Sequence, residues 1–342
     1  MKAMVINKIV DLNSNPNPLD LIELPKPTVQ GDEVLLKVSV CGICHTELDE
    51  IEGRTPPSRF PMIPGHQVIG RVVETGREVK DVRLNDRMGV AWIYSACGHC
   101  DHCLNGAENL CNDFVATGRD RHGGYAEFMK VPASFAYPIP PNLEDAEAAP
   151  LLCAGSIGYR SLNMTRLKDG QRLGLTGFGA SAHLVLKMIK YKFPNTPVYV
   201  FARKASERDF ALSLGAVWSG DTSALPPEPL DAVIDTTPAW KPVIEALKCL
   251  KPGGRLVINA IRKENTDKDY LQNLDYPRHL WLEKEIRSVA NVTRSDVSEF
   301  LALASAMGIK PSYREYTPEE VNKALVELKF NHVAGAKVLR IS

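Results

Sequence analysis

The spacing of hydrophobic and polar positions gives the chain two parts of different character. In the first part, residues 31–40 and 65–76 alternate apolar and polar side chains between glycine, proline and aspartate positions, a pattern typical of half-buried β-strands. The opening segment, residues 1–10, alternates in the same way and predicts a short strand. Residues 1–140 are therefore predicted to be rich in β-structure.

From about Leu151 onward, the pattern changes to strands that alternate with helices. The predicted strands are 172–177, 197–202, 231–237 and 254–260, and the predicted helices are 181–192, 207–215 and 241–250. Such alternation favours a doubly wound parallel sheet of the α/β class. After about residue 284 shorter elements return, and the chain ends on a predicted strand at 336–342.

Length and charge limit the classes of function. A chain of 342 residues exceeds one comfortable core, so we expect two domains. Lys and Arg together number 41, as do Asp and Glu, and this balance argues against nucleic acid or anionic lipid as a partner. No apolar run approaches the roughly 18 residues that span a membrane, and Asp11 and Asn13 follow the first strand too soon for a secretory signal. We therefore expect a cytoplasmic protein whose eight cysteines are reduced or bind metal.

Four cysteines lie close together in the first half of the chain. Cys97, Cys100, Cys103 and Cys111 follow the spacing C-x2-C-x2-C-x7-C. Four thiolates at this spacing can fill the tetrahedral shell of one Zn²⁺ and leave no open position, as in structural zinc sites. The segment that carries them has little apolar content, so zinc has to hold it together.

A second set of candidate ligands is spread along the chain. Cys44, His66 and Cys153 could supply three ligands and leave a fourth position open, which is the arrangement of a catalytic zinc. Cys41 and Cys44 form a C-x2-C pair, so spacing alone does not decide which of these two is the ligand. The sequence thus predicts two zinc ions per chain, one structural and one catalytic.

A glycine-rich motif follows the strand predicted at 172–177. It fits G-x-G-x-x-G/A, and it lies between a strand and a helix, as in dinucleotide-binding proteins. The first glycine permits a tight turn, and the second lets the backbone approach a pyrophosphate at the helix N-terminus. The predicted cofactor contacts are Gly177, Phe178, Gly179, Ala180, Ser181 and Ala182.

The tip of the next predicted strand indicates which dinucleotide binds. A site for NAD usually has an acidic residue there, but this chain has Ala202, Arg203 and Lys204. Arg203 can pair with the 2′-phosphate of NADP. We predict a preference for NADP(H), with NAD(H) also possible. The alternative is a solvated basic loop that discriminates little between the two.

Together these features resemble the zinc-dependent alcohol dehydrogenases of the medium-chain dehydrogenase/reductase superfamily. The resemblance implies a GroES-like β-rich catalytic domain (residues 1–150 and 284–342) with a structural zinc lobe at about 95–113. It also implies a Rossmann cofactor domain at 151–283, with the active site in the cleft between the domains. The matching stretches are CGICHTELD (41–49), PGHQVIGRV (64–72), CGHCDHCLNGAENLC (97–111), GGYAEF (123–128), APLLCAGSIGYR (149–160), the glycine motif and NVTRSD (291–296).

The resemblance also implies roles for individual residues. It selects Cys44 over Cys41 as the zinc ligand, and it leaves Cys41 and Cys249 as buried thiols. Glu47 matches the acid that orients the zinc-bound histidine, and Thr46 matches the hydroxyl that relays the substrate proton. His45 and Arg294 match contacts to the cofactor pyrophosphate. Further cofactor contacts are predicted at Thr236, Ala260, Ile261 and Asn291.

Three positions depart from the family pattern. Gln67 follows the zinc-binding histidine where many relatives have glutamate, which makes the metal surroundings less anionic. Asp49 takes the place of a relay histidine, and its ordinary pKa of about 3.9 suits proton transfer near neutrality less well. Ile157 replaces a threonine near the nicotinamide, so an apolar surface is expected there.

The resemblance therefore implies an NAD(P)-linked zinc alcohol dehydrogenase or aldehyde reductase. Hydride would pass between the substrate carbon held at the catalytic zinc and C4 of the nicotinamide. A polyol or cinnamyl-alcohol-type dehydrogenase on the same scaffold is the alternative. A non-enzymatic zinc module is disfavoured by the zero net charge, and zinc-free quinone reductases lack both cysteine sets. Small alcohols or aldehydes are the expected partners, and relatives suggest a homotetramer or, less often, a dimer.

Overall fold

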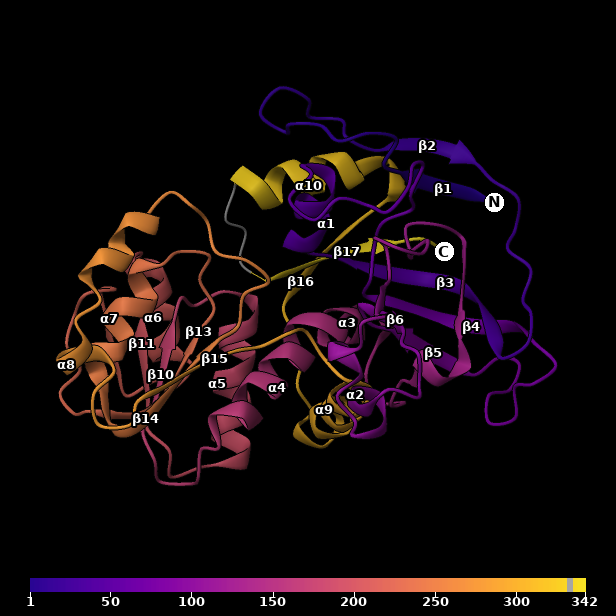
Figure 1. Ribbon diagram of the computed structural model, residues 1–342. Coiled ribbons are helices and arrows are strands. Elements are labelled where there is room, and N and C mark those ends of the chain that lie inside the picture. Colours follow the sequence, from indigo (N-terminus) through magenta and orange to yellow (C-terminus); the bar gives the residue numbers. More distant parts are fainter. Residues whose placement is uncertain (331–334) are drawn as a thin grey trace. The chain divides into compact units, whose positions relative to one another are not determined.

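The chain folds into two compact units. The computed structural model describes residues 1–330 and 335–342 (Figure 1). One unit combines Met1–Cys153 with Val292–Ser342, and the other is formed by Ala154–Asn291. The structure thus has the predicted α/β fold, with a GroES-like unit and a Rossmann-like unit.

The first unit is built on a mostly antiparallel sheet with the strand order β16-β17-β3-β4-β5-β9, and β8 also pairs with β3. Its strands are β1 (Lys2–Val5), β2 (Asp20–Glu23), β3 (Glu33–Ile43), β4 (Val68–Thr75), β5 (Arg87–Val90), β6 (Ile93–Ser95), β7 (Val115–Ala116), β8 (Phe128–Pro132), β9 (Ala136–Pro138), β16 (Tyr313–Tyr316) and β17 (Ala336–Arg340). Its helices are α1 (His45–Ile51), α2 (Asp101–Leu104), α3 (Asp145–Pro150), α9 (Arg294–Met307) and α10 (Val321–Phe330), with short 3₁₀ turns η1 (Glu108–Leu110), η2 (Ala133–Phe135) and η5 (Pro318–Glu320).

Strand β3 is the centre of this unit. Its inward-facing residues, including Val34, Leu36, Val38 and Val40, are completely buried, as the alternating sequence pattern predicts. The strand pairs antiparallel with β4, β8 and β17. In Figure 1 the yellow C-terminal strand β17 accordingly lies beside the indigo β3. The last segment of the chain therefore completes a sheet that the first segment begins.

The second unit contains a six-stranded parallel sheet with the order β12-β11-β10-β13-β14-β15. Its strands are β10 (Leu173–Thr176), β11 (Val198–Phe201), β12 (Trp218–Gly220), β13 (Leu230–Asp235), β14 (Leu250–Ile258) and β15 (Glu285–Ser288). Its helices are α4 (Ser156–Thr165), α5 (Ala180–Lys192), α6 (Ala205–Ser213), α7 (Lys241–Cys249) and α8 (Tyr276–His279), with the 3₁₀ turn η4 (Lys268–Asn273). Along the chain, the π-helical turn η3 (Leu151–Gly155) contains the last residues of the first unit and the first residues of the second.

The strand order reverses direction between β10 and β13, because β11 and β12 lie on one side of β10 and the later strands lie on the other. In open parallel sheets, ligands bind beyond the carboxyl ends of the strands at such a switch point. We therefore expect a ligand of this unit to contact the residues that follow β10, β13 and β14.

The last parallel strand lies beyond the boundary expected at residue 283. β15 pairs in parallel with β14, from Arg255↔Glu285 to Ile258↔Ser288, so the second unit extends to Asn291. All four residues of β15 are exposed, and such a short strand lacks the apolar pattern that marks β11 or β13. Its pairing is a tertiary feature that the hydrophobic spacing does not reveal.

Among the described residues, no helix is both long enough and apolar enough to cross a lipid bilayer.

Candidate functional site

Cys44, His66 and Cys153 come together in the first unit. Cys44 is the residue before α1, His66 precedes β4, and Cys153 lies in the turn η3. The two sulfur atoms are 3.9 Å apart, and the three possible ligand atoms lie within 4.8 Å of one another. Residues separated by up to 109 positions are thus placed at the spacing of a single metal shell.

Glu47 fixes the orientation of His66. Its carboxylate lies 2.6 Å from His66 Nδ1 and also accepts a hydrogen bond of 2.7 Å from the main-chain N–H of Cys44. The Nε2 atom of His66 is buried and has no hydrogen-bond partner among the described residues. A buried imidazole nitrogen without a partner, next to two thiols, fits a zinc ion as the missing partner.

The electrostatic surroundings favour a thiolate at Cys44. A hydrogen bond from Cys153 and further interactions with His66 hold the pKa of Cys44 well below its ordinary value, despite burial. The same contact with Cys44 raises the pKa of Cys153. Burial raises the pKa of the Glu47 carboxyl, although His66 opposes the shift. The Cys44 sulfur is therefore the thiol of this pair whose surroundings favour loss of its proton.

The other predicted residues of α1 have different surroundings. Thr46 places its Oγ1 3.7 Å from the sulfur of Cys44. Asp49 is buried, and its Oδ1 accepts a hydrogen bond of 2.5 Å from Arg54 Nε. The Asp49 carboxylate is therefore engaged with a guanidinium that sequence reasoning did not consider, since nothing in the spacing marked Arg54.

The four remaining predicted zinc ligands also converge. The sulfur atoms of Cys97, Cys100, Cys103 and Cys111 lie within 4.8 Å of one another. Main-chain N–H groups of Cys97, Cys100 and Asp113 point at sulfur atoms of this group, at 3.3 to 3.5 Å. The helix α2 in this lobe has no buried residue, so the lobe has little apolar core of its own. Gly98 and Gly106 adopt positive φ angles of 79° and 67°, which allow the tight turns between the ligands.

The remaining cysteines belong to neither group. Cys41 is fully buried, and its sulfur lies 3.6 Å from the carbonyl oxygen of Gly42. Cys249 is buried in α7 with its sulfur 3.5 Å from the carbonyl oxygen of Glu245. Burial raises the pKa of Cys249 to about 11, so it stays a neutral thiol near neutral pH.

The glycine motif forms the turn between β10 and α5 in the second unit. Gly177 has φ of 74°, and a methyl group there would lie 2.9 Å from Thr237 Cγ2 and 3.0 Å from Thr236 Oγ1. Gly177 is therefore required both for its backbone conformation and for space. A side chain at Gly179 would meet no described atom within 4 Å, which leaves the helix N-terminus open to a ligand. Ala182 is completely buried, as expected for the small third position.

The side chains around this turn are fixed by local contacts. Phe178 is buried against Phe210 with ring centroids 5.7 Å apart. Ser181 donates to the carbonyl oxygen of Ala154 and accepts a hydrogen bond from Asn259, each at 3.1 Å. Ala180 is the first residue of α5. Phe178 and Ser181 thus serve to fix the turn itself.

The basic tip after β11 is exposed. Ala202 is buried, whereas Arg203 and Lys204 are exposed, and neither side chain has a hydrogen-bond partner among the described residues. Arg208 fixes the main chain beneath them, because its guanidinium donates to the carbonyl oxygens of Ala202 at 2.8 Å and Arg203 at 2.9 Å. Arg208 was not singled out from the sequence, although it lies within one turn of the predicted tip.

The other predicted cofactor residues fall in two places. Thr236, Ala260 and Ile261 follow β13 and β14 at the carboxyl edge of the parallel sheet, and Asn291 ends that unit with φ of 57°. His45 and Arg294 belong to the first unit. There Arg294 Nε donates to the buried Glu108 at 2.9 Å, and its guanidinium lies 5.2 Å from the ring centroid of Phe135.

The fold and these sites define a medium-chain dehydrogenase, and comparisons with known proteins agree. Residues 30–141 match the model of the alcohol dehydrogenase GroES-like domain. A probable alcohol dehydrogenase of Mycobacterium tuberculosis is 42% identical over 95% of this chain and 93% of its own length. An alcohol dehydrogenase of Geobacillus stearothermophilus is 31% identical over 100% of this chain and 99% of its own.

Solved structures show the same fold. A cinnamyl alcohol dehydrogenase of Sorghum bicolor superposes with a TM-score of 0.84 at 27% identity and covers 99% of this chain and 97% of its own. A thermostable alcohol dehydrogenase of Pyrobaculum aerophilum, described as binding cobalt and zinc, has a TM-score of 0.85 at 24% identity over 100% and 99% of the two chains. The chain belongs to the alcohol dehydrogenases of the medium-chain dehydrogenase/reductase superfamily, as its motifs indicate.

Proposed function

We propose that this protein is a zinc-dependent, NAD(P)-linked alcohol dehydrogenase and aldehyde reductase that prefers NADP(H). The observation that carries the proposal is the cluster of Cys44, His66 and Cys153, whose possible ligand atoms lie within 4.8 Å of one another. Among the described residues, the buried Nε2 of His66 has no hydrogen-bond partner. The same chain also has the glycine turn between β10 and α5, which we expect to bind the dinucleotide. When bound, zinc supplies a Lewis acid for the substrate oxygen, and the nicotinamide supplies or accepts the hydride.

The protein's own contribution is to hold and orient these groups. Cys44, His66 and Cys153 would bind the catalytic zinc, and Glu47 would keep the Nδ1 proton of His66 so that Nε2 faces the metal. Thr46 lies beside the ligand Cys44 and is suited to pass on the proton of the substrate hydroxyl. Cys97, Cys100, Cys103 and Cys111 would hold the second, structural zinc.

The preference for NADP(H) rests on Arg203 and Lys204. Their exposed cationic side chains replace the carboxylate that repels a 2′-phosphate, and Arg208 keeps their main chain in place. The side chains have no other described partner, so they are available to pair with a phosphate.

One experiment tests the proposal as a whole. Zinc content would be measured on the purified protein, and oxidation of NADPH and NADH would be followed with benzaldehyde and with a short aliphatic aldehyde. The proposal expects two zinc ions per chain and a higher kcat/KM with NADPH. A preference for NADH would refute the cofactor assignment but keep the enzyme class. No turnover in protein with both zinc ions would contradict the proposed substrates.

A cinnamyl-alcohol-type reductase is a second candidate. The likeness to the Sorghum bicolor enzyme supports it. A much higher kcat/KM for cinnamaldehyde than for benzaldehyde and aliphatic aldehydes would favour this candidate, and efficient turnover of sugar alcohols would favour a polyol dehydrogenase.

We also propose that the protein is a homo-oligomer of the cytoplasm, a tetramer or a dimer. β15 is an edge strand of the parallel sheet with all four residues exposed. Trp281, Leu282 and Ile286 on or beside it expose 55%, 51% and 43% of their surface. An open strand edge with apolar neighbours is suited to pairing with the same edge of a second copy.

A further inference from the structure

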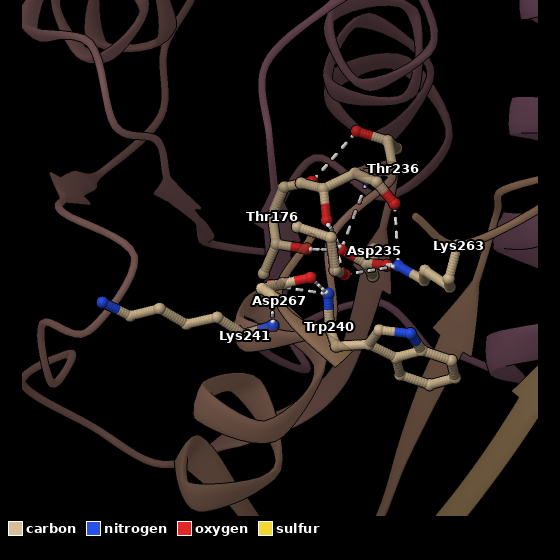
Figure 2. Close-up of polar contacts among 9 residues, drawn as sticks. Thr176, Asp235, Thr236, Trp240, Lys241, Lys263 and Asp267 are labelled. Atoms are coloured by element: carbon tan, nitrogen blue, oxygen red, sulfur yellow. Dashed lines mark hydrogen bonds and ion pairs between the residues drawn. The ribbon is translucent and has the colours of Figure 1, made fainter. Parts of the chain in front are cut away.

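A buried ion pair lies at the carboxyl edge of the parallel sheet, outside the residues that the sequence singled out. Figure 2 shows Lys263 reaching Asp235, the last residue of β13. The side chain of Lys263 is 8% exposed and that of Asp235 is 0% exposed. The ammonium also donates to the carbonyl oxygens of Thr237 at 2.7 Å and Ala239 at 3.0 Å. All three of its hydrogen-bonding positions are therefore used within the protein.

Asp235 connects this lysine to the neighbouring strand. Its Oδ1 accepts hydrogen bonds from Thr176 Oγ1, at the end of β10, and from Thr237 Oγ1 at 2.8 Å. Lys263 itself comes from the segment that follows β14. The pair thus joins the carboxyl ends of β10, β13 and β14, which are adjacent in the sheet.

A second contact ties the same two segments together farther along the chain. The Asp267 carboxylate accepts the main-chain N–H groups of Trp240, at 2.9 Å, and Lys241, at 2.8 Å, where α7 begins. Between the two contacts, the N–H of Glu264 donates to the carbonyl oxygen of Pro238 at 2.7 Å. The turn 236–239 is therefore held along its length by the segment that follows β14.

The glycine turn that follows β10 packs against the turn 236–239. A methyl group on Gly177 would come within 3.0 Å of both Thr236 and Thr237, and Thr236 Oγ1 donates to the carbonyl oxygen of Thr176 at 2.9 Å. A change in the turn would therefore be transmitted to the glycine loop. The contact matters because that loop must hold the pyrophosphate closely.

We infer that Lys263 is a positioning residue for the dinucleotide, whose ammonium, paired with Asp235, holds the turn 236–239 in the conformation that the bound cofactor requires. This inference rests on the proposed function, because it takes the glycine loop as the cofactor site. A buried ion pair is a weak source of stability, since the loss of hydration offsets the attraction. We infer that the pair instead holds the carboxyl ends of β10, β13 and β14 in one arrangement. Less conformational entropy is then lost when the dinucleotide binds.

The test compares two double variants, in each of which a buried acid is replaced by its amide and its lysine partner by methionine. Lys263→Met alone would leave a buried carboxylate without its partner, so the main variant is the neutral pair D235N/K263M, with K263M beside it. The control is E245Q/K248M, which removes a largely buried ion pair of 2.6 Å within α7, while the amide of E245Q keeps an acceptor for the hydroxyl of Tyr270. Lys248 lies in the last turn of that helix, just before β14 begins, at the opposite edge of the sheet.

The readouts are the thermal midpoint without cofactor, the Kd of NADPH by nucleotide fluorescence, and the KM values for nucleotide and aldehyde. We expect D235N/K263M to fold with a midpoint near that of the control and to raise the Kd and KM of NADPH by at least about tenfold, since lost preorganisation weakens binding. The KM of the aldehyde should change little, and the control should bind NADPH as the unmodified protein does.

Each other outcome overturns the inference in a recognisable way. An unchanged Kd in folded D235N/K263M, or an equal loss in the control, would show that the pair does not position the cofactor. Unfolding of both K263M and D235N/K263M would show that the ion pair is needed for folding and has no specific role in binding the cofactor. Failure of the unmodified protein to bind either NADPH or NADH would refute the proposed function together with the inference.

Discussion

At the scale of single residues, buried hydrogen bonds hold the side chains of the candidate zinc site in one orientation. His66 is 1% exposed, and the Glu47 carboxylate, 0% exposed, fixes its ring from the Nδ1 side. The Cys44 main chain is fixed by the same carboxylate. One buried acid thus orients two of the three proposed ligands, which explains why a carboxylate is retained where its charge is costly.

Glu47→Gln is the residue-scale prediction. The amide keeps the shape of the side chain but removes the charge that supports His66, so we expect zinc affinity at the catalytic site to fall about 10- to 100-fold. Titration with a zinc indicator measures this change. Activity should return when excess zinc is added, and occupancy of the four-cysteine site should stay the same. An unchanged affinity would contradict the proposed role of Glu47.

At the scale of elements, the two cysteine groups differ in what surrounds them. Cys44 and Cys153 are held by β3, α1 and η3, which pack into the core of the first unit. The lobe that carries Cys97 to Cys111 has only a short helix without buried residues. Loss of metal should therefore affect chemistry at the first group and folding at the second.

This difference gives a prediction that pairs two variants. His66→Ala should lower turnover to less than about 1% while the thermal midpoint stays close to that of the unmodified protein, because the proposed Lewis acid is lost from a prebuilt site. Cys100→Ser should instead lower the midpoint by at least about 5 °C, since its loss removes a ligand that helps to fold the lobe. Thermal scans and steady-state rates measure both. Equal loss of folding in the two variants would contradict this division.

The tip of β11 carries a separate prediction. Arg203→Ala should raise the KM of NADPH roughly 10- to 100-fold, as expected from the loss of one or two charge-assisted hydrogen bonds to a phosphate. The KM of NADH should change less than about threefold, because NADH has no 2′-phosphate to lose. Lys187→Ala, on α5, is the control for the general loss of a positive charge. An equal effect on both nucleotides would show that Arg203 does not recognise the phosphate.

At the scale of the whole molecule, the chain returns to its first domain after building its second. β17 pairs with β3, and β15 closes the parallel sheet as an exposed edge. An edge of this kind is a liability in isolation and is usually covered. The proposed oligomer would provide that cover through the same strand of a second copy.

Ile286→Lys tests the assembly. A charge in the middle of β15 should prevent pairing of two edges, so we expect the mass measured by light scattering to fall by at least half. Ile261→Lys, a change at a residue of similar exposure that lies outside β15, serves as the control. An unchanged mass for Ile286→Lys would place the interface elsewhere.

Much of this architecture could be predicted from the sequence, because its signals are local. The strand predicted at 172–177 and the helix at 181–192 correspond to β10 and α5, since hydrophobic period and glycine placement act within a few residues. The two cysteine groups were recognisable because metal ligation limits both residue type and spacing. The family likeness that these motifs indicated is shown by relatives that align over nearly the whole chain.

What only the tertiary structure decided concerns pairs that are distant along the chain. No spacing rule connects Lys263 with Asp235, Arg54 with Asp49, or Arg294 with Glu108, because a single Lys or Arg is an ordinary surface residue until a fold buries it beside an acid. The placement of β15 is of the same kind, since a short exposed strand is specified by its neighbour rather than by its own pattern. The sequence by itself determined the class of fold and the candidate ligands through local chemistry, and the tertiary structure decided which charges meet, because burial and distance are properties of the folded chain.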